Sequence, residues 1–319
     1  MKNIAITLAA SVTCLIFCAE INAADQNVTY TDPAKVDADY AIQGEYSGVI
    51  GGKKMGVQVI ALGDGKFDAV GFEGGLPGEG GENSKAIKSG GETKGVKTTF
   101  ANFMGGATIH DGAFTITGKN GKLARTVRQS KTLGMKAPEG AVVLFDGSST
   151  DAFKNGKMTE GKLLQTGTTG KQLFGSHKIH MEFRTPYKPF ARGQGRGNAG
   201  FYVQSRYETQ ILDSFGLEGK MNETGGIYSI KAPDLNMCFP PLTWQTYDID
   251  FTAAEFKDGK KVKNGTMTVA LNGVVVQDNV ELTHRTTASP LEEGPEGGPV
   301  YLQNHGNPVV YQNIWVVEK

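Results

Sequence analysis

The sequence predicts an all-β protein whose larger part is a two-layer β-sandwich or jelly roll. Short segments in which apolar and polar residues alternate recur along the chain, and turn signals separate them. Glycine is abundant, with 44 residues in 319, and long amphipathic helical patterns are hard to find. Many short strands at this spacing are typical of a sandwich or jelly roll.

Residues 1–24 have the pattern of a secretory signal peptide. Lys2 supplies the positive charge, residues 4–19 form an uncharged apolar run, and small residues precede an expected cleavage after Ala23 or Ala24. The run is too short for a comfortable transmembrane helix. We therefore expect an exported protein (periplasmic, cell-surface or secreted) that has no membrane span. Cleavage would leave Cys238 without a partner for an internal disulfide.

Residues 25–135 are predicted to form a small β-rich domain, either an antiparallel sheet or a barrel. Glycine-rich hairpin turns at 51–53 and 63–65 separate the first strand-like runs. Glu73–Gly95 has almost no apolar content and is predicted to be a long exposed loop. The strand-like runs are Glu45–Ile50, Met55–Ala61, Lys66–Phe72, Lys97–Phe100, Ala107–His110, Ala113–Thr117 and Leu123–Val127. No catalytic constellation stands out in this part of the chain.

Residues 141–319 are predicted to form the sandwich domain, after a joint at 132–140 that contains Pro138 and two glycines. Asn272-Gly273 is a strong hairpin turn between two of its strands. The expected strands include Val142–Phe145, Lys178–Thr185, Thr246–Phe251, Thr266–Leu271, Val274–Gln277 and Val309–Val317.

The stretch Gly197–Asp213 is the most informative part of this domain, because it predicts two adjacent strands with one polar face. Side chains along a strand alternate between its faces. The polar face then carries Asn198, Tyr202, Glu208 and Gln210, while apolar residues point inward. Asp213 can join the polar face only if the strand bulges or turns near residues 211–212.

Glu208 and Asp213 are candidates for an acid/base pair, in which one carboxyl group stays protonated and the other ionised. The alternative is an edge strand whose polar face is simply solvated.

Four further residues are candidates for substrate contacts. Trp244 follows a rigid turn and is either a platform for a sugar ring or a core residue. Tyr228 and Lys231 lie near a strand end. One sheet of a sandwich is concave, and its polar residues form a groove; Gln303 precedes a lone His305 that we expect to line this groove. The glycine-rich loop Arg192–Gly197 has no βαβ context, so we interpret it as a basic rim loop beside the groove and not as a nucleotide-binding motif.

The charge balance gives no sign of a polyanionic partner. Lys and Arg together number 33, as do Asp and Glu. We expect no nucleic-acid partner and a neutral substrate.

The segment from Ala141 to the C-terminus resembles the 3-keto-disaccharide hydrolase domain family. The motifs that carry the resemblance stand in the same order, and the segment that resembles the family is more than half of the chain. They are LFDG at 144–147, GNAGFY at 197–202, YETQILD at 207–213, GIY at 226–228, WQTY at 244–247, LNG at 271–273 and LQNHGNP at 302–308. Two positions depart from the family pattern: Asn304 stands where the family usually has Asp, and Ala199 where it usually has Ser.

The resemblance implies a concanavalin A-like jelly roll that acts on a carbohydrate, with elimination chemistry on a 3-keto glycoside. Glu208 would be the general base, and Asp213 or His305 the acid. Lys231 or Arg184 would hold the enolate oxygen. No cofactor is predicted, although a divalent metal ion is an alternative enolate stabiliser. Two other functions stay open: a non-catalytic lectin-like module and a conventional glycoside hydrolase.

Overall fold

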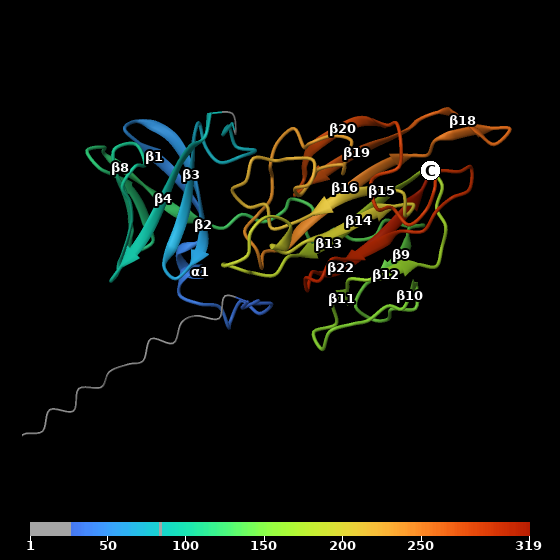
Figure 1. The fold of residues 1–319 in the computed structure, drawn as a ribbon, viewed down its shortest axis with the longest axis horizontal. Coiled ribbons are helices and arrows are strands. Elements are labelled where there is room, and N and C mark those ends of the chain that lie inside the picture. The colour runs from blue at the N-terminus through green and yellow to red at the C-terminus, as the bar shows by residue number, and fades with distance from the viewer. Residues whose placement is uncertain (1–26, 83–84) are drawn as a thin grey trace, which may run out of the picture.

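The chain forms a β-barrel followed by a β-sandwich, as seen in the computed structural model, which describes residues 27–82 and 85–319 (Figure 1). The prediction of an all-β sandwich preceded by a smaller antiparallel β domain is confirmed. The expected signal peptide at 1–24 lies outside the described residues.

Eight antiparallel strands close the barrel, because β1 pairs with both β2 and β8. A short helix, α1 (Asp39–Ile42), precedes them. Buried apolar side chains, including Tyr46, Phe67, Phe100 and Phe114, form a common core cluster in this part of the chain. The strands are β1 (Gly44–Ile50), β2 (Lys53–Gly63), β3 (Lys66–Glu73), β4 (Ile87–Lys94), β5 (Lys97–Phe100), β6 (Ala107–His110), β7 (Ala113–Ile116) and β8 (Gly121–Thr126).

Strand β4 corrects the prediction that Glu73–Gly95 is one long loop. It pairs with β3 and with β5 and so completes the barrel wall. After Ile87 its sequence has no large apolar residue, and glycine makes room for a neighbour: a Cβ on Gly91 would lie 2.3 Å from Cδ1 of Phe100. The large side chain that fills this space comes from β5, so β4 itself shows no hydrophobic alternation.

The sandwich consists of two antiparallel sheets. The five-stranded sheet has the order β10-β12-β21-β14-β15, formed by Phe153–Lys154, Thr168–Gly170, Tyr301–Asn304, Ala199–Val203 and Tyr207–Ile211. The seven-stranded sheet has the order β11-β22-β13-β16-β19-β20, formed by Leu164–Gln165, Val310–Glu318, His177–Arg184, Gln245–Thr252, Gly265–Leu271 and Val274–Leu282, and β9 (Val142–Phe145) pairs with β22. A separate hairpin consists of β17 (Glu255–Lys257) and β18 (Lys260–Lys263).

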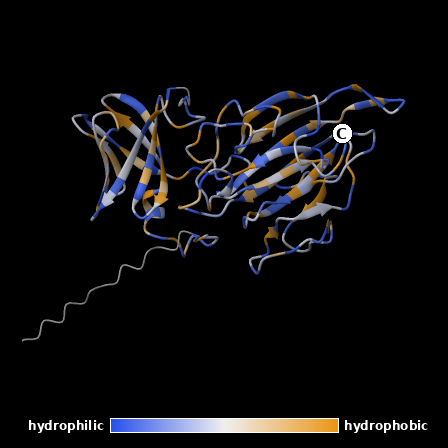
Figure 2. Ribbon diagram, viewed as in Figure 1, coloured by the Kyte–Doolittle hydropathy of each residue, from blue (hydrophilic) through white to orange (hydrophobic). Residues whose placement is uncertain are grey.

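Apolar side chains from both sheets form one continuous core, and Figure 2 shows the alternating colours along their strands. In the five-stranded sheet, Phe201, Val203 and Ile211 point into this core and are fully buried. Their neighbours along the same strands therefore face away from it. This arrangement presents the polar residues of β14 and β15 on the outer face of the five-stranded sheet.

A buried polar cluster on the seven-stranded sheet holds the segment between barrel and sandwich. His180 Nδ1 lies 2.6 Å from Asp248 Oδ1, and its Nε2 lies 3.4 Å from Glu182 Oε1. Burial opposes protonation of His180, but its hydrogen bonds to these carboxylates raise its pKa. The same carboxylates accept hydrogen bonds from Gly134 N–H (2.6 Å) and the Thr132 hydroxyl (2.6 Å), both in the joint.

Barrel and sandwich also pack directly on each other. Tyr187 and Leu242 of the sandwich belong to the core cluster of the barrel. Tyr40 beside the barrel donates a hydrogen bond to the Pro241 carbonyl at 3.1 Å, and the Tyr187 hydroxyl donates to Asp37 at 3.0 Å. Shared apolar and polar contacts therefore connect the two parts of the chain.

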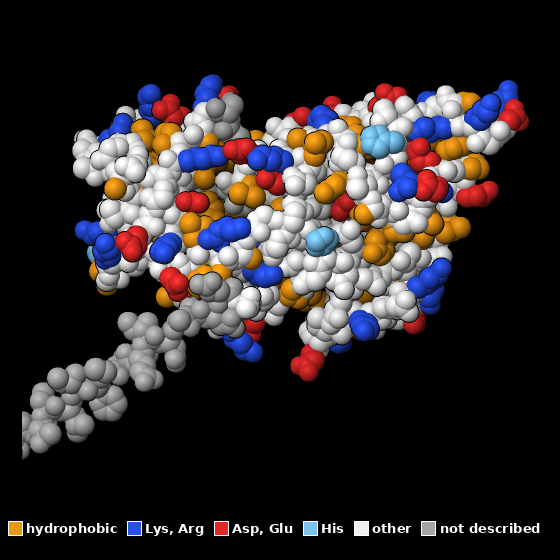
Figure 3. Space-filling model, in the orientation of Figure 1, with side chains coloured by type: hydrophobic (Ala, Val, Ile, Leu, Met, Phe, Trp, Pro, Cys, Tyr) orange, Lys and Arg blue, Asp and Glu red, His pale blue; other side chains and the backbone are white. Residues whose placement is uncertain are grey.

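The face drawn in Figure 3 mixes Lys and Arg with Asp and Glu and has no large area of one charge. Within residues 27–82 and 85–319, no helix has the length and apolar character that crossing a membrane requires.

Candidate active site

A buried carboxylate, that of Glu208, lies on the outer face of the five-stranded sheet and is the centre of the candidate site. Its strand β15 pairs with β14, and this register places Tyr202 directly opposite Glu208. The Tyr202 hydroxyl donates a hydrogen bond to Glu208 Oε2 at 2.8 Å, and Gln303 Nε2 donates to the Tyr202 oxygen at 3.1 Å. The three side chains come from three adjacent strands, β15, β14 and β21.

Burial controls the protonation of this carboxyl group. Glu208 is only 3% exposed, and desolvation raises its pKa to about 7, although the hydrogen bond from Tyr202 acts in the opposite direction. Near neutral pH both protonation states are therefore populated. A general base works best when its pKa lies near the working pH.

Gly200 makes room for the carboxylate on the neighbouring strand. A Cβ at this position would lie 2.3 Å from Glu208 Oε1 and 3.0 Å from Gln303 Oε1. Any larger residue would displace one of these groups, which explains why a glycine interrupts the polar face of β14.

Three amide side chains form a network beside Glu208. Gln194 Oε1 accepts hydrogen bonds from Asn198 Nδ2 and from Gln210 Nε2, both at 3.0 Å. Gln194 Nε2 donates to the Asn222 carbonyl at 2.9 Å. Gln210 Oε1 is buried and has no partner among the described residues, so it is available to accept a hydrogen bond from a ligand hydroxyl.

These groups line a pocket of about 100 Å³. That volume is below the roughly 300–1,000 Å³ of typical small-molecule sites, so it matches the polar edge of a ligand and not a whole disaccharide. His305 is exposed at the pocket, next to β21. The lining residues are Gln194, Asn198, Glu208, Gln210, Tyr228, Thr287, Ala288, Gln303 and His305.

The structure thus brings together most of the residues singled out from the sequence. The pocket is lined by Asn198, Glu208, Gln210, Tyr228, Gln303 and His305, and Tyr202 is hydrogen-bonded to Glu208 from the neighbouring strand.

Asp213 does not join Glu208, which corrects its assignment as the partner acid. Strand β15 ends at Ile211, so the chain turns before Asp213. Asp213 Oδ2 accepts a hydrogen bond from Arg196 Nε at 2.7 Å, and both side chains are buried. Asp213 instead lines a separate cavity of about 490 Å³ between barrel and sandwich.

Arg184, Trp244 and Lys231 do not line the pocket, so the structure does not bring them together with Glu208 as the sequence predicted. The Arg184 guanidinium stacks on Trp244, 5.0 Å from the ring centroid, and Arg184 Nη2 donates to the Thr31 carbonyl. Lys231 pairs with Asp234 and also donates to Gln277 Oε1 of β20. Arg184 and Gln277 belong to strands of the seven-stranded sheet, and the sequence alone does not show which strands form which sheet.

Sequence reasoning missed Gln194, Thr287 and Ala288. Gln194 lies in the glycine-rich loop that was predicted to form a rim beside the groove, so the position of that loop was a usable signal. Thr287 and Ala288 follow Thr286, whose hydroxyl accepts a hydrogen bond from the Glu208 N–H at 2.9 Å. No pattern in their segment marks them.

The described residues contain no group of three or more His, Cys, Asp or Glu side chains placed to hold a metal ion. In the pocket, Glu208 is the carboxylate and His305 the imidazole, and amides supply most of the remaining polar atoms.

Comparison with known proteins identifies the sandwich. Residues 140–317 match the model of the 3-keto-alpha-glucoside-1,2-lyase-like domain. The chain belongs to this family. No curated protein matches it.

Solved structures from Parabacteroides distasonis are similar to part of this chain. One, a "putative glycosyl hydrolase", is 32% identical with a TM-score of 0.52, and the match covers 57% of this chain and 85% of that one. A second, with the same description, is 19% identical with a TM-score of 0.42 and covers 57% of this chain and 94% of that one. The family match leaves residues 1–139, and with them the barrel, uncovered.

Proposed function

We propose that this protein cleaves the glycosidic bond of a 3-keto glycoside by base-promoted elimination at the pocket around Glu208. The family match and the likeness to a described glycosyl hydrolase support an enzyme that acts on glycosidic bonds. The observation that carries the finer proposal is the Glu208 carboxylate, which is buried, faces a polar pocket and has its pKa raised to about 7.

The reaction begins with proton removal. A ketone at C3 of the sugar acidifies the C2 proton, and Glu208 takes that proton while the electron pair moves into the C3 carbonyl to give an enolate. The enolate then expels the glycosidic oxygen from C1, and the departing oxygen receives a proton, with His305 as the candidate donor. Water adds to the resulting double bond and yields the free 3-keto sugar.

The enolate needs a hydrogen-bond donor in the pocket. Arg184 and Lys231 lie elsewhere, so Tyr228 takes this role in our proposal. Tyr228 lines the pocket and is partly exposed, and its backbone N–H is fixed by the Glu208 carbonyl at 3.1 Å. Gln210 Oε1 and the Asn198 amide would bind hydroxyl groups of the sugar.

The position of Asp213 argues against a conventional glycoside hydrolase. Such enzymes use two carboxyl groups about 5–5.5 Å or 6.5–9.5 Å apart across the scissile bond. Among the residues that line the pocket, Glu208 is the one carboxylate, because Asp213 is paired with Arg196. One base and a ketone-activated proton need no second carboxylate.

The test is an assay of purified protein on a 3-keto disaccharide and on its unoxidised parent, side by side. We expect turnover of the 3-keto substrate only. Glu208→Gln is nearly isosteric, and loss of a general base should reduce the rate about 10²–10⁴-fold while sugar binding persists. Glu281→Gln, an exposed position on β20, is the matched control. Equal turnover of the parent sugar would favour a conventional hydrolase, and binding without turnover would favour a lectin-like module.

We also propose export, on the pattern of residues 1–24. N-terminal sequencing of protein from its native host should begin at Ala24 or Asp25. An intact Met1 on the active protein would exclude export by cleavage of this segment.

A further inference from the structure

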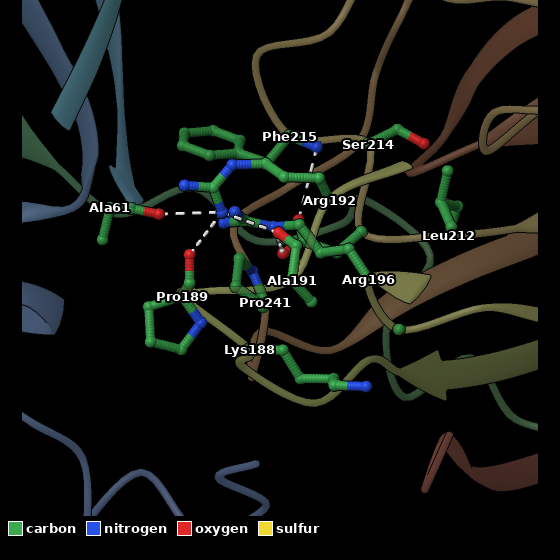
Figure 4. Close-up of polar contacts among 12 residues, drawn as sticks. Ala61, Lys188, Pro189, Ala191, Arg192, Arg196, Leu212, Ser214, Phe215 and Pro241 are labelled. Carbon is green, nitrogen blue, oxygen red and sulfur yellow. Dashed lines mark hydrogen bonds and ion pairs between the residues drawn. The ribbon is translucent and has the colours of Figure 1, made fainter. Parts of the chain in front are cut away.

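The glycine-rich loop Arg192–Gly197 lies between the barrel and the pocket. Gln194 lines the pocket, whereas Arg192 and Arg196, on either side of it, line the larger cavity between barrel and sandwich. Figure 4 shows both arginine side chains extending toward Ala61, a barrel residue. The loop therefore contacts the two parts of the molecule through alternate residues.

Both arginines bind carbonyl groups at the end of barrel strand β2. Arg192 Nη2 donates to the Leu62 carbonyl at 3.1 Å, and Arg196 Nη1 donates to the Ala61 carbonyl at 3.3 Å. Phe190, just before the loop, also packs closely against the end of β2: a Cβ on Gly63 would lie 2.3 Å from the Phe190 ring. Main-chain acceptors of the barrel and side chains of the sandwich thus meet at one edge of the barrel.

The arginines also fix the loop itself. Arg192 Nη1 donates to the Pro189 and Ala191 carbonyls at 2.5 and 2.7 Å. Buried Arg196 binds Asp213, which follows the strand that carries Glu208 and Gln210. Arg192 and Arg196, which flank the short 3₁₀ turn Gly193–Gly195, are therefore both held by hydrogen bonds. These bonds restrict the movement of Gln194 at the centre of the turn.

We propose that the barrel is a positioning element for the candidate active site: through Arg192 and Arg196 it holds the loop so that Gln194 organises Asn198 and Gln210 for the substrate. This inference rests on the proposed function. Arg192 and Arg196 are positioning residues, and Gln194 is a determinant of substrate binding. The hydrogen bonds of Gln194 to Asn198 and Gln210, both 3.0 Å, are the route by which the loop acts.

The charges of the interdomain cavity fit this role better than they fit a charged ligand. Four cationic and four anionic side chains line the cavity. Lys88 binds Glu218 across it at 2.9 Å, and Arg196 binds Asp213. The lining charges are equal in number, and the two ion pairs join the surfaces that meet at the cavity.

The test is a double-mutant cycle in the full chain, with Arg192→Gln, Gln194→Ala and the double variant. Arg192 is exposed, so its replacement should leave the fold intact. Loss of the hydrogen bonds that Arg192 makes to Leu62, Pro189 and Ala191 should raise KM for the 3-keto disaccharide roughly two- to tenfold with little change in kcat, because Gln194 binds ground state and transition state alike. If Arg192 acts through Gln194, Arg192→Gln has no further effect on KM in the Gln194→Ala background.

Lys88→Gln is the matched control, because Lys88 lines the same cavity but binds Glu218 and not the loop. Hydrogen exchange gives a readout independent of turnover: the N–H groups of Gly195 and Arg196, which bond to Arg192 and Gly193 carbonyls, should exchange faster in Arg192→Gln and not in Lys88→Gln. Additive KM effects, or unchanged exchange in Arg192→Gln, would overturn the positioning role. A wild-type protein without turnover on any glycoside would overturn the proposed function alone and leave the exchange result to decide this inference.

Discussion

At the scale of single residues, the burial of Glu208 raises its pKa and makes its ionised form less stable. Its pKa is about 7 in the folded protein against an ordinary value of 4.5, so burial favours the neutral form. The stabilisation that this gives is fully present below pH 4.5 and is lost as pH rises through about 7. The ionised carboxylate that the reaction needs is therefore the destabilised form.

A first prediction follows for stability. Because glutamine carries no charge, Glu208→Gln should be more stable than the wild type at pH 8. Its free energy of unfolding should be higher by on the order of 3 kcal/mol, and it should unfold at a higher denaturant concentration. At pH 4 the two proteins should be nearly equal. Denaturant titrations at both pH values measure the difference. A Glu208→Gln variant that is less stable at pH 8 would show that the carboxylate is not buried as described.

A second prediction concerns Tyr202, whose hydrogen bond lowers the pKa of Glu208 against the effect of burial. Tyr202→Phe should raise that pKa further, so the acid limb of the pH–rate profile should move to higher pH. Tyr301→Phe is the control, since its ring lies 5.3 Å from that of Tyr202 and no hydrogen bond joins it to Glu208. An unmoved acid limb in Tyr202→Phe would mean that another group controls the rate.

At the scale of elements, strand parity explains what the sequence could and could not predict. Alternation along β14 and β15 correctly placed Asn198, Tyr202, Glu208 and Gln210 on one outer face. Parity says nothing beyond the end of a strand, and Asp213 lies two residues past it.

The remaining errors have a different physical cause. Parity cannot assign a strand to a sheet, so it could not show that Arg184 of β13 belongs to the seven-stranded sheet. Parity also does not predict strand β4, because the large apolar side chain beside Gly91 is that of Phe100 on the next strand. Long-range pairing decides both cases, and a single sequence does not reveal it.

A third prediction tests the glycine of β14. Gly200→Ala would place a methyl group 2.3 Å from Glu208 Oε1, so the carboxylate must move. We expect loss of activity with a stability cost of about 1–3 kcal/mol, as for other overpacked positions. Gly90→Ala on β4 is the matched control, because its nearest neighbour would be 3.9 Å away. Activity assays and thermal unfolding of both variants compare the effects, and an active Gly200→Ala protein would contradict the close packing of this face.

At the scale of the whole molecule, Arg128 joins the barrel to the sandwich. Its Nε donates to Glu45 Oε2 at 2.7 Å, and Gln58 Nε2 donates to the same carboxylate at 3.0 Å. The guanidinium of Arg128 also lies 5.0 Å from the ring centroid of Phe239 in the sandwich. Glu45 is 1% exposed, so its carboxylate is buried with Arg128 as its ion-pair partner.

The last prediction is that barrel and sandwich unfold together and that Arg128 contributes to this cooperativity. Arg128→Met leaves a buried carboxylate without its cation, which typically costs about 3–5 kcal/mol. We expect one calorimetric transition that moves to lower temperature as a whole, and Glu45→Gln in the same chain should recover part of the loss because it removes the unpaired charge. Lys122→Met, at an exposed position on β8, should leave the transition unchanged. If the barrel melts separately while the sandwich keeps its midpoint, the two parts are energetically independent, and the contacts of Arg128 and of the Arg192–Gly197 loop do not couple them.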